Sequence, residues 1–335
     1  SGQPELSSGT KQAYRLANGM FSEVVGVYYG QTYFGAEAKA DVEDMIHKMI
    51  DVYEKRISEN DWLSEDTKKK AIVKLRALIL KIGYPEKIEK IYDRLQVTPE
   101  SEGGSLYSNE SAAAVESVKY NLEKLNEPVD RTVWLMPGNL VNACYDPQRN
   151  DITFPAAILQ KPFYDLKQSR SLNYGGIGVV IAHEISHAFD NNGSLFDEFG
   201  NLNNWWTDED SAHFKQLAQK MIEEFDGIPF AGQKVNGKLT VSENIADAGG
   251  LSCALEAAKT EADFNAQEFF INWATIWRMK ATEQYMQLLL SIDVHAPQKL
   301  RANIQAENLD DFYTAFDIKP GNEMYRAPED RVHIW

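Results

Sequence analysis

The chain has 335 residues, of which 43% are hydrophobic and 25% are charged, a composition that is ordinary for a soluble globular protein. Its 34 lysines and arginines stand against 50 acidic residues, and the resulting net charge of −16 argues against nucleic acid or an anionic membrane surface as a partner. No apolar run approaches the length of a membrane span. Cys144 and Cys253 are the only cysteines, too few for a secreted disulfide framework.

Helices dominate the predicted elements. Apolar residues recur every three or four positions in the first part of the chain, where Ser64 and Gly83 supply a start and a stop signal. The segment 100–109, with its serines and glycines, is predicted to be a linker. Predicted helices cover 11–34, 36–59, 64–82, 112–125, 175–189, 212–224, a segment that includes Glu243, and 266–291. Short strands near 142–145 and 152–154 complete a mainly α chain with a small antiparallel β-sheet.

The most informative segment is His183-Glu184-Ile185-Ser186-His187, which lies in the predicted buried helix at 175–189. Residues four apart share one helix face, so both imidazoles can reach one metal ion. This HExxH arrangement is typical of zinc peptidases, in which the histidines hold Zn²⁺ and Glu184 handles the proton of the attacking water. The alternative is a pair of core histidines bound to backbone carbonyls.

A catalytic zinc site needs a third protein ligand, and Glu243 with Asp247 forms a second pair spaced four residues apart. Both carboxylates are predicted to lie on one helix face. One can bind zinc while the other accepts the free N–H of a ligating imidazole. The alternative is that Thr240 and Glu243 only form a helix capping box.

Several motifs together resemble those of the neprilysin family of zinc endopeptidases. The segments that carry the resemblance are the HExxH motif, Glu243-Asn244-Ile245-Ala246-Asp247, Asn142-Ala143-Cys144-Tyr145, 154–163, Asp293-Val294-His295-Ala296-Pro297, Arg301 and the terminal Trp335. The resemblance extends from about Gln12 to the C-terminus. The small number of cysteines points to the bacterial PepO oligopeptidases as the most similar branch of the family.

The resemblance implies a thermolysin-like zinc metallopeptidase catalytic domain at residues 101–335 and the end of a helical, lid-like second domain at residues 1–100. One zinc ion per chain is implied, with His183, His187 and Glu243 as ligands and Asp247 behind a ligating imidazole. Glu184 is the implied general base. By similarity His295 stabilises the oxyanion, and Asp293 is a plausible partner that orients it.

A peptide-binding site is implied as well. Family members grip the substrate backbone with the asparagine and alanine that match Asn142 and Ala143, and they bind a substrate carbonyl with the arginine that matches Arg301. An apolar pocket is implied at Ile158, Phe163, Val180, Ile276 and Trp277, and helical spacing places Val179 and Val180 on the metal-facing side of the zinc helix. The implied activity is hydrolysis of short peptides on the amino side of bulky hydrophobic residues.

When each of these residues is taken alone, an ordinary structural role without function remains an alternative. Asn142 fits a turn, Arg301 a solvated charge, His295 a surface histidine, and the pocket residues ordinary core. Nothing in the chain matches the long N-terminal portion of the family, so a fragment that lacks this portion of its polypeptide is expected. A catalytically silent zinc- or peptide-binding fragment and a different metallohydrolase, such as an aminopeptidase, are the alternative functions. A bacterial cytoplasmic location is expected, with an exported or cell-surface form as the alternative.

Overall fold

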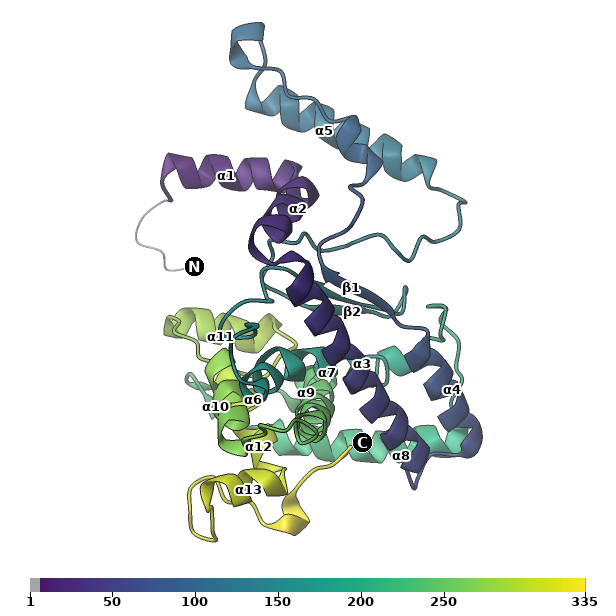
Figure 1. The fold of residues 1–335 in the computed structure, drawn as a ribbon, viewed down its shortest axis with the longest axis vertical. Coiled ribbons are helices and arrows are strands. Elements are labelled where there is room, and N and C mark those ends of the chain that lie inside the picture. The colour runs from purple at the N-terminus through teal and green to yellow at the C-terminus, as the bar shows by residue number, and fades with distance from the viewer. Residues whose placement is uncertain (1–6, 335) are drawn as a thin grey trace.

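The computed structural model of the chain describes residues 7–334 and consists mostly of helices around a three-stranded sheet (Figure 1). The strands of this sheet are β1 (Ile79–Gly83), β2 (Cys144–Asp146) and β3 (Asp151–Pro155), in the order β1-β3-β2. β2 pairs antiparallel with β3, as the sequence predicts. β1 pairs parallel with β3, so the sheet is mixed rather than wholly antiparallel. A separate hairpin joins β4 (Pro229–Phe230) to β5 (Gln233–Lys234).

The helices in chain order are α1 (Gly9–Met20), α2 (Ser22–Tyr33), α3 (Gly35–Glu59), α4 (Glu65–Arg76), α5 (Leu106–Glu123), α6 (Arg170–Asn173), α7 (Val179–Ser186), α8 (Asp208–Phe225), α9 (Gly237–Ala258), α10 (Ala266–Ile276), α11 (Glu283–Ile292), α12 (Gln298–Glu307) and α13 (Asp310–Phe316). A π-helical turn at Tyr174–Gly178 connects α6 to α7.

The predicted helix at 64–82 is wrong in its last third. α4 begins after its N-cap Ser64, as predicted, but it ends at Arg76, and residues 79–83 form β1. The short, mostly apolar run at 78–82 is compatible with either a helix or a strand when only its local periodicity is considered. The choice depends on β3, which comes much later in the chain and which a local pattern does not reveal.

Two other predicted helices are each divided in two. The helix predicted at 11–34 breaks at Phe21, where φ is −119° and ψ is 36°, so α1 and α2 are separate. The helix predicted at 266–291 breaks between α10 and α11. Thr282 caps the start of α11 by accepting a hydrogen bond from the N–H of Tyr285, and this cap stabilises a new helix start.

One hydrophobic core joins α3, α4 and the sheet to α7, α9 and α10. α3 contributes the fully buried residues Val42, Met45, Ile46 and Met49, and β3 contributes Ile152 and Phe154. Residues on both sides of the predicted boundary near residue 100 therefore share a core, and the boundary itself stays a prediction. A second cluster packs α8 against α9 and α12 and includes Val332 and Ile334.

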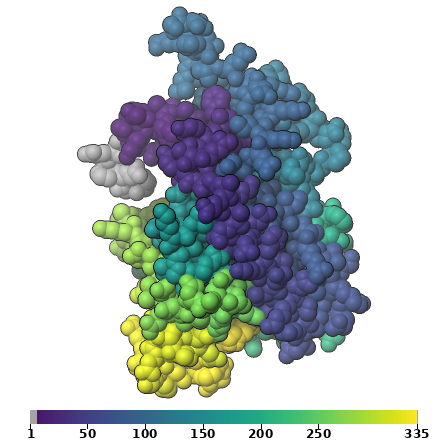
Figure 2. Space-filling view, viewed as in Figure 1, coloured from purple at the N-terminus to yellow at the C-terminus, as the bar shows by residue number. Residues whose placement is uncertain are grey.

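α1 and α5, like α11, contain no buried residue within the described part of the chain. Figure 2 shows both helices at one end of the molecule, in purple and blue. α5 exposes a row of apolar side chains that includes Leu106, Tyr107, Val115, Val118 and Leu122. Among residues 7–334, no helix is long and apolar enough to cross a lipid bilayer.

Candidate metal centre and active site

The two helices with the predicted metal ligands, α7 and α9, approach each other closely at Gly250. A Cβ atom at Gly250 would lie 2.8 Å from the backbone nitrogen of His183 and 2.9 Å from its Cα, so only glycine permits this approach. Tyr53 of α3 holds α7 from another side. Its hydroxyl donates to the carbonyl of Ala182 at 2.9 Å and lies 2.5 Å from Oγ of Ser186. The position of the HExxH helix is thus fixed by its neighbours.

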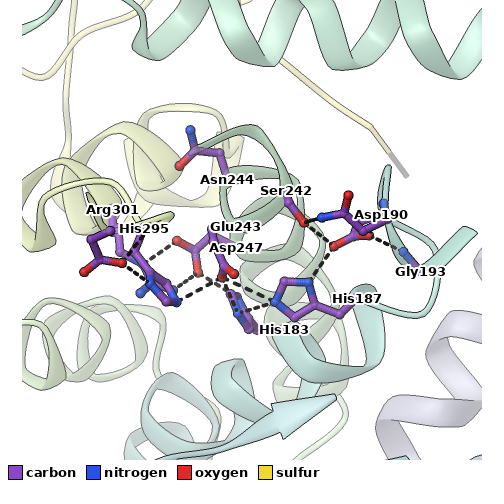
Figure 3. A network of polar contacts seen from close by, with 12 residues as sticks. His183, His187, Asp190, Gly193, Ser242, Glu243, Asn244, Asp247, His295 and Arg301 are labelled. Atoms are coloured by element: carbon purple, nitrogen blue, oxygen red, sulfur yellow. Dashed lines mark hydrogen bonds and ion pairs between the residues drawn. The ribbon is translucent and has the colours of Figure 1, made fainter. Parts of the chain in front are cut away.

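Three predicted ligand atoms converge between α7 and α9 (Figure 3). Nε2 of His183 and Nε2 of His187 are 3.0 Å apart, and each lies 3.3 Å from Oε2 of Glu243. Three ligands of a tetrahedral zinc ion with bonds of 2.0–2.1 Å are about 3.3 Å apart. Glu184 also has an oxygen within 4.8 Å of both ring nitrogens. Glu243 lies nearer, so the geometry favours Glu243 as the third ligand.

The chemistry of these atoms also fits a cation. Nδ1 of His183 lies 2.8 Å from Oδ1 of Asp247, and Nδ1 of His187 lies 2.6 Å from Oδ2 of Asp190. A neutral imidazole that donates from Nδ1 carries a lone pair on Nε2. In this form two lone pairs and a carboxylate oxygen face one point, and either protons on the imidazoles or a divalent cation can neutralise the negative charge there. Burial raises the pKa of Glu243, but its contacts with the imidazoles outweigh burial and hold this pKa far below the usual value.

The two histidines have different partners behind them. Asp247, behind His183, accepts two hydrogen bonds from Arg301, at 2.7 Å from Nε and 2.8 Å from the terminal nitrogen Nη2. Burial raises the pKa of Asp247, whereas Arg301 and His183 lower it to about 2, so this carboxyl is ionised at neutral pH. Asp190, behind His187, instead accepts from the hydroxyl of Ser242 at 2.5 Å.

Asp190 and Ser242 belong to the site, although the motifs of the sequence did not predict them. Asp190 follows His187 by three residues, a spacing that brings side chains to the same side of a helical turn, and this spacing was the available signal. The capping alternative for Glu243 is wrong. Asn236 is the N-cap of α9, and Thr240 lies inside the helix with its hydroxyl directed to the carbonyl of Asn236.

Glu184 and His295 lie beside the three ligand atoms. Glu184 is 6% exposed, and burial raises the pKa of its carboxyl. Nε2 of His295 lies 3.2 Å from Oε2 of Glu243, and its Nδ1 lies 2.6 Å from Oδ1 of Asp293. The side chain of His295 is 39% exposed, compared with 8% for His183. His295 therefore occupies the more open side of the site and is not an isolated surface histidine.

The residues predicted to bind the substrate backbone lie at different depths. Asn142 is exposed and lies two residues before β2, an edge strand of the sheet, and Ala143 packs against the core. Arg301 is 5% exposed, so it is not a solvated charge. Its guanidinium lies 3.9 Å from the ring centroid of Trp277 and is bound to Asp247.

The predicted pocket residues all belong to or border the main hydrophobic core. Val179 is fully buried, whereas Val180, Ile158 and Ile276 retain 8%, 5% and 9% exposure. Phe163 and Trp277 are partly buried and pack against the same core. These side chains therefore lie in or against the core that also contains the zinc helix, and their contact with a substrate stays a prediction.

A His-His-Glu centre on two packed helices, with a further glutamate beside it, defines a site of the zinc-peptidase class. Family models described as peptidase family M13 match residues 142–332 and residues 1–85. The chain belongs to this family.

Relatives and solved structures agree with this assignment. The chain is 61% identical to a neutral endopeptidase of Lactobacillus helveticus over 335 residues, which cover all of this chain and 51% of the relative. The crystal structure of PepO from Lactobacillus rhamnosis superposes with a TM-score of 0.93 at 47% identity, covering 100% of this chain and 53% of that one. The structure of the Mycobacterium tuberculosis zinc metalloprotease Zmp1 in complex with an inhibitor superposes with a TM-score of 0.91 at 35% identity. The match covers 100% of this chain and 52% of that one. The chain thus spans about half the length of the relatives that it matches.

Proposed function

We propose that this chain carries the catalytic zinc centre of an endopeptidase that hydrolyses short peptides. The observation that carries the proposal is the triangle of His183 Nε2, His187 Nε2 and Glu243 Oε2, with sides of 3.0–3.3 Å. Two neutral imidazoles and one carboxylate match the ligand set of a catalytic zinc site with an open position. One zinc ion per chain, bound there, supplies Lewis acidity toward a water molecule and a peptide carbonyl.

The chain's own side chains handle the protons. Glu184 takes the proton of the attacking water and delivers it to the leaving amine, and burial raises the pKa of its carboxyl. His295 donates from Nε2 to the negative charge that develops on the carbonyl oxygen. Asp293 accepts from Nδ1 of His295, which orients the ring and favours the imidazolium form, the form that carries a second hydrogen on Nε2 for this donation.

Substrate binding is proposed at the edge of the sheet. An extended peptide can pair with β2 through main-chain hydrogen bonds, with the side chain of Asn142 and the backbone of Ala143 at its start. Ile158, Phe163, Val180, Ile276 and Trp277 are proposed to line the apolar pocket for a bulky residue on the carboxyl side of the cleaved bond. Arg301 is proposed to reach a substrate carbonyl from its position against Asp247. The bacterial cytoplasm stays the predicted location.

The test is Glu184→Gln in a polypeptide of the relatives' full length. The amide keeps the shape of the side chain but cannot shuttle a proton, so turnover should fall roughly 10²-fold or more while zinc content stays the same. Mass spectrometry of cleaved test peptides then locates the cut relative to bulky hydrophobic residues. Undiminished turnover in the variant would rule out Glu184 as the base. Zinc binding without any cleavage by the unmodified protein would favour the catalytically silent alternative.

A further inference from the structure

A buried lysine of α4, Lys74, binds the segment that follows the zinc helix. Lys74 is 1% exposed, and its Nζ donates hydrogen bonds to the carbonyl oxygens of Ala188, Gly193 and Phe196 at 2.7, 2.6 and 2.8 Å. These three acceptors use all three hydrogens of an ammonium group. Within residues 7–334 Lys74 forms no ion pair, and the hydrogen bonds of its Nζ go to main-chain carbonyls instead. The side chain thus ties together both ends of the turn at 188–196.

This turn carries the carboxylate behind one of the proposed zinc ligands. Asp190 contacts Nδ1 of His187 with Oδ2 at 2.6 Å, and its Oδ1 accepts from the backbone N–H groups of Asn192 and Gly193 at 2.7 Å each. Where Asp190 lies therefore depends on the path of the turn. All three carbonyls lie beyond Ser186, the last residue of α7, and a buried carbonyl needs a hydrogen-bond donor.

The surroundings of the ammonium group compensate for part of the cost of its burial. Its Nζ lies 5.8–5.9 Å from the ring centroids of Tyr145, Phe189 and Trp205. Such ring faces attract a cation. Burial lowers the pKa of Lys74 to about 7, and the nearby carboxylate of Asp190 opposes this shift. Tyr145 belongs to β2, so Lys74 also lies between the proposed peptide-binding edge and the turn behind His187.

We propose that Lys74 is a positioning residue for the zinc ligand His187. It fixes the turn at 188–196, the turn fixes Asp190, and Asp190 holds the His187 ring with its Nε2 toward the metal. This inference rests on the proposed function, in which His187 binds zinc. Loss of Lys74 leaves three carbonyls without their donor and lets the turn relax, and the second carboxylate–imidazole contact then weakens.

A matched control lies in the adjoining strand. Lys81 of β1 is also buried, at 3% exposure, and its Nζ donates to the carbonyl of Val133 at 2.7 Å and to Asp151 at 2.6 Å. None of these partners belongs to the turn at 188–196. Lys81→Met therefore removes a buried ammonium group and disturbs the same fold without touching the support of His187.

The experiment measures the zinc dissociation constant by competition with a chelator in a polypeptide of the relatives' full length. It also records the visible absorption of Co²⁺ bound in place of zinc, which reports the ligand geometry directly. Lys74→Met should weaken zinc binding about 10- to 100-fold, as expected for a group that supports a ligand, and should change the Co²⁺ spectrum. Lys81→Met should leave both unchanged. Lys74→Gln, which keeps an amide donor, serves as a milder variant if Lys74→Met fails to fold.

A double-mutant cycle with Asp190→Asn tests the route of the effect. If Lys74 acts through Asp190, the two substitutions should weaken zinc binding less than additively. Equal losses for the Lys74 and Lys81 variants, additive losses in the cycle, or an unchanged Co²⁺ spectrum would each overturn the inference. His187→Ala distinguishes failure of the proposed zinc site from failure of the proposed role of Lys74. Unchanged zinc affinity in that variant would refute the zinc site itself.

Discussion

The two imidazoles of the site are supported by carboxylates in different electrostatic settings. Asp247 shares its charge with the guanidinium of Arg301, whereas Asp190 receives hydrogen bonds from the neutral Ser242 hydroxyl and from backbone N–H groups. A carboxylate without a paired cation polarises its imidazole more strongly. His187 should therefore be the more basic of the two ligands.

The first prediction separates the third ligand from its neighbour on α9. Glu243→Ala should abolish tight zinc binding, since only two imidazoles remain, whereas Asp247→Ala should weaken it about 10- to 100-fold. Metal analysis after dialysis against a chelator measures both. Undiminished zinc affinity in Glu243→Ala would remove this residue from the ligand set and would point to Glu184 as the ligand.

The second prediction concerns pH. Burial lowers the pKa of His187, but its contacts with Asp190 and Glu243 outweigh burial and hold this pKa well above the ordinary 6.5. A proton thus competes with zinc for Nε2 at a higher pH than at an ordinary histidine, so zinc affinity should rise with pH through the neutral range and fall on acidification. Chelator competition between about pH 5.5 and 8 measures this dependence. A flat affinity across the upper half of that range would contradict the prediction.

At the scale of the elements, the close contact of α7 with α9 determines where the ligands meet. The third prediction is that Gly250→Ala destabilises the protein by about 1–3 kcal/mol and weakens zinc binding, because the new Cβ displaces the backbone of His183. Gly19→Ala in α1 is the matched control, since a Cβ there has nothing within 4 Å. Thermal unfolding and zinc titration of both variants decide the matter. Equal stability would show that α9 can move aside without cost.

Sequence patterns revealed the parts of the site that depend on local spacing. His183 with His187, and Glu243 with Asp247, are each separated by one helical turn, so each pair could be identified before any tertiary contact was known. β1 could not be separated from α4, because its parallel partner β3 lies far along the chain. The ion pair of Arg301 with Asp247 likewise joins two helices that are far apart in the sequence, and no pattern within either helix predicts it.

At the scale of the whole molecule, α5 has an apolar face that no other part of residues 7–334 buries. Val118 and Leu122 lie one turn apart on this helix and are 58% and 63% exposed. Exposed apolar patches of this kind are sites of association. The chain also spans about half the length of its relatives, so a segment present in those longer chains is the expected covering.

The fourth prediction follows from this surface. The 335-residue chain should associate at micromolar concentrations, and its kcat/KM on a short peptide should be lower than that of a polypeptide of the relatives' full length, because catalysis requires the substrate to be held in place. Light scattering after gel filtration measures the size. The double variant Val118→Lys/Leu122→Lys should restore the monomer without changing zinc content. A strictly monomeric parent chain with full activity would contradict the prediction.

The core of this protein joins residues that are far apart in the sequence, and this has a consequence for its synthesis. Tyr53 of α3 binds the carbonyl of Ala182, and Arg56 binds Ser252, across separations of 129 and 196 residues. Ribosomes add about 5–20 residues per second, so the buried face of α3 waits on the order of 10–40 s for its partners. During that interval Met45, Ile46 and Met49, which are buried in the folded chain, should be exposed to solvent or to a chaperone. Slower translation before α9 is complete should therefore lower the yield of folded protein, and chaperone supply should restore it.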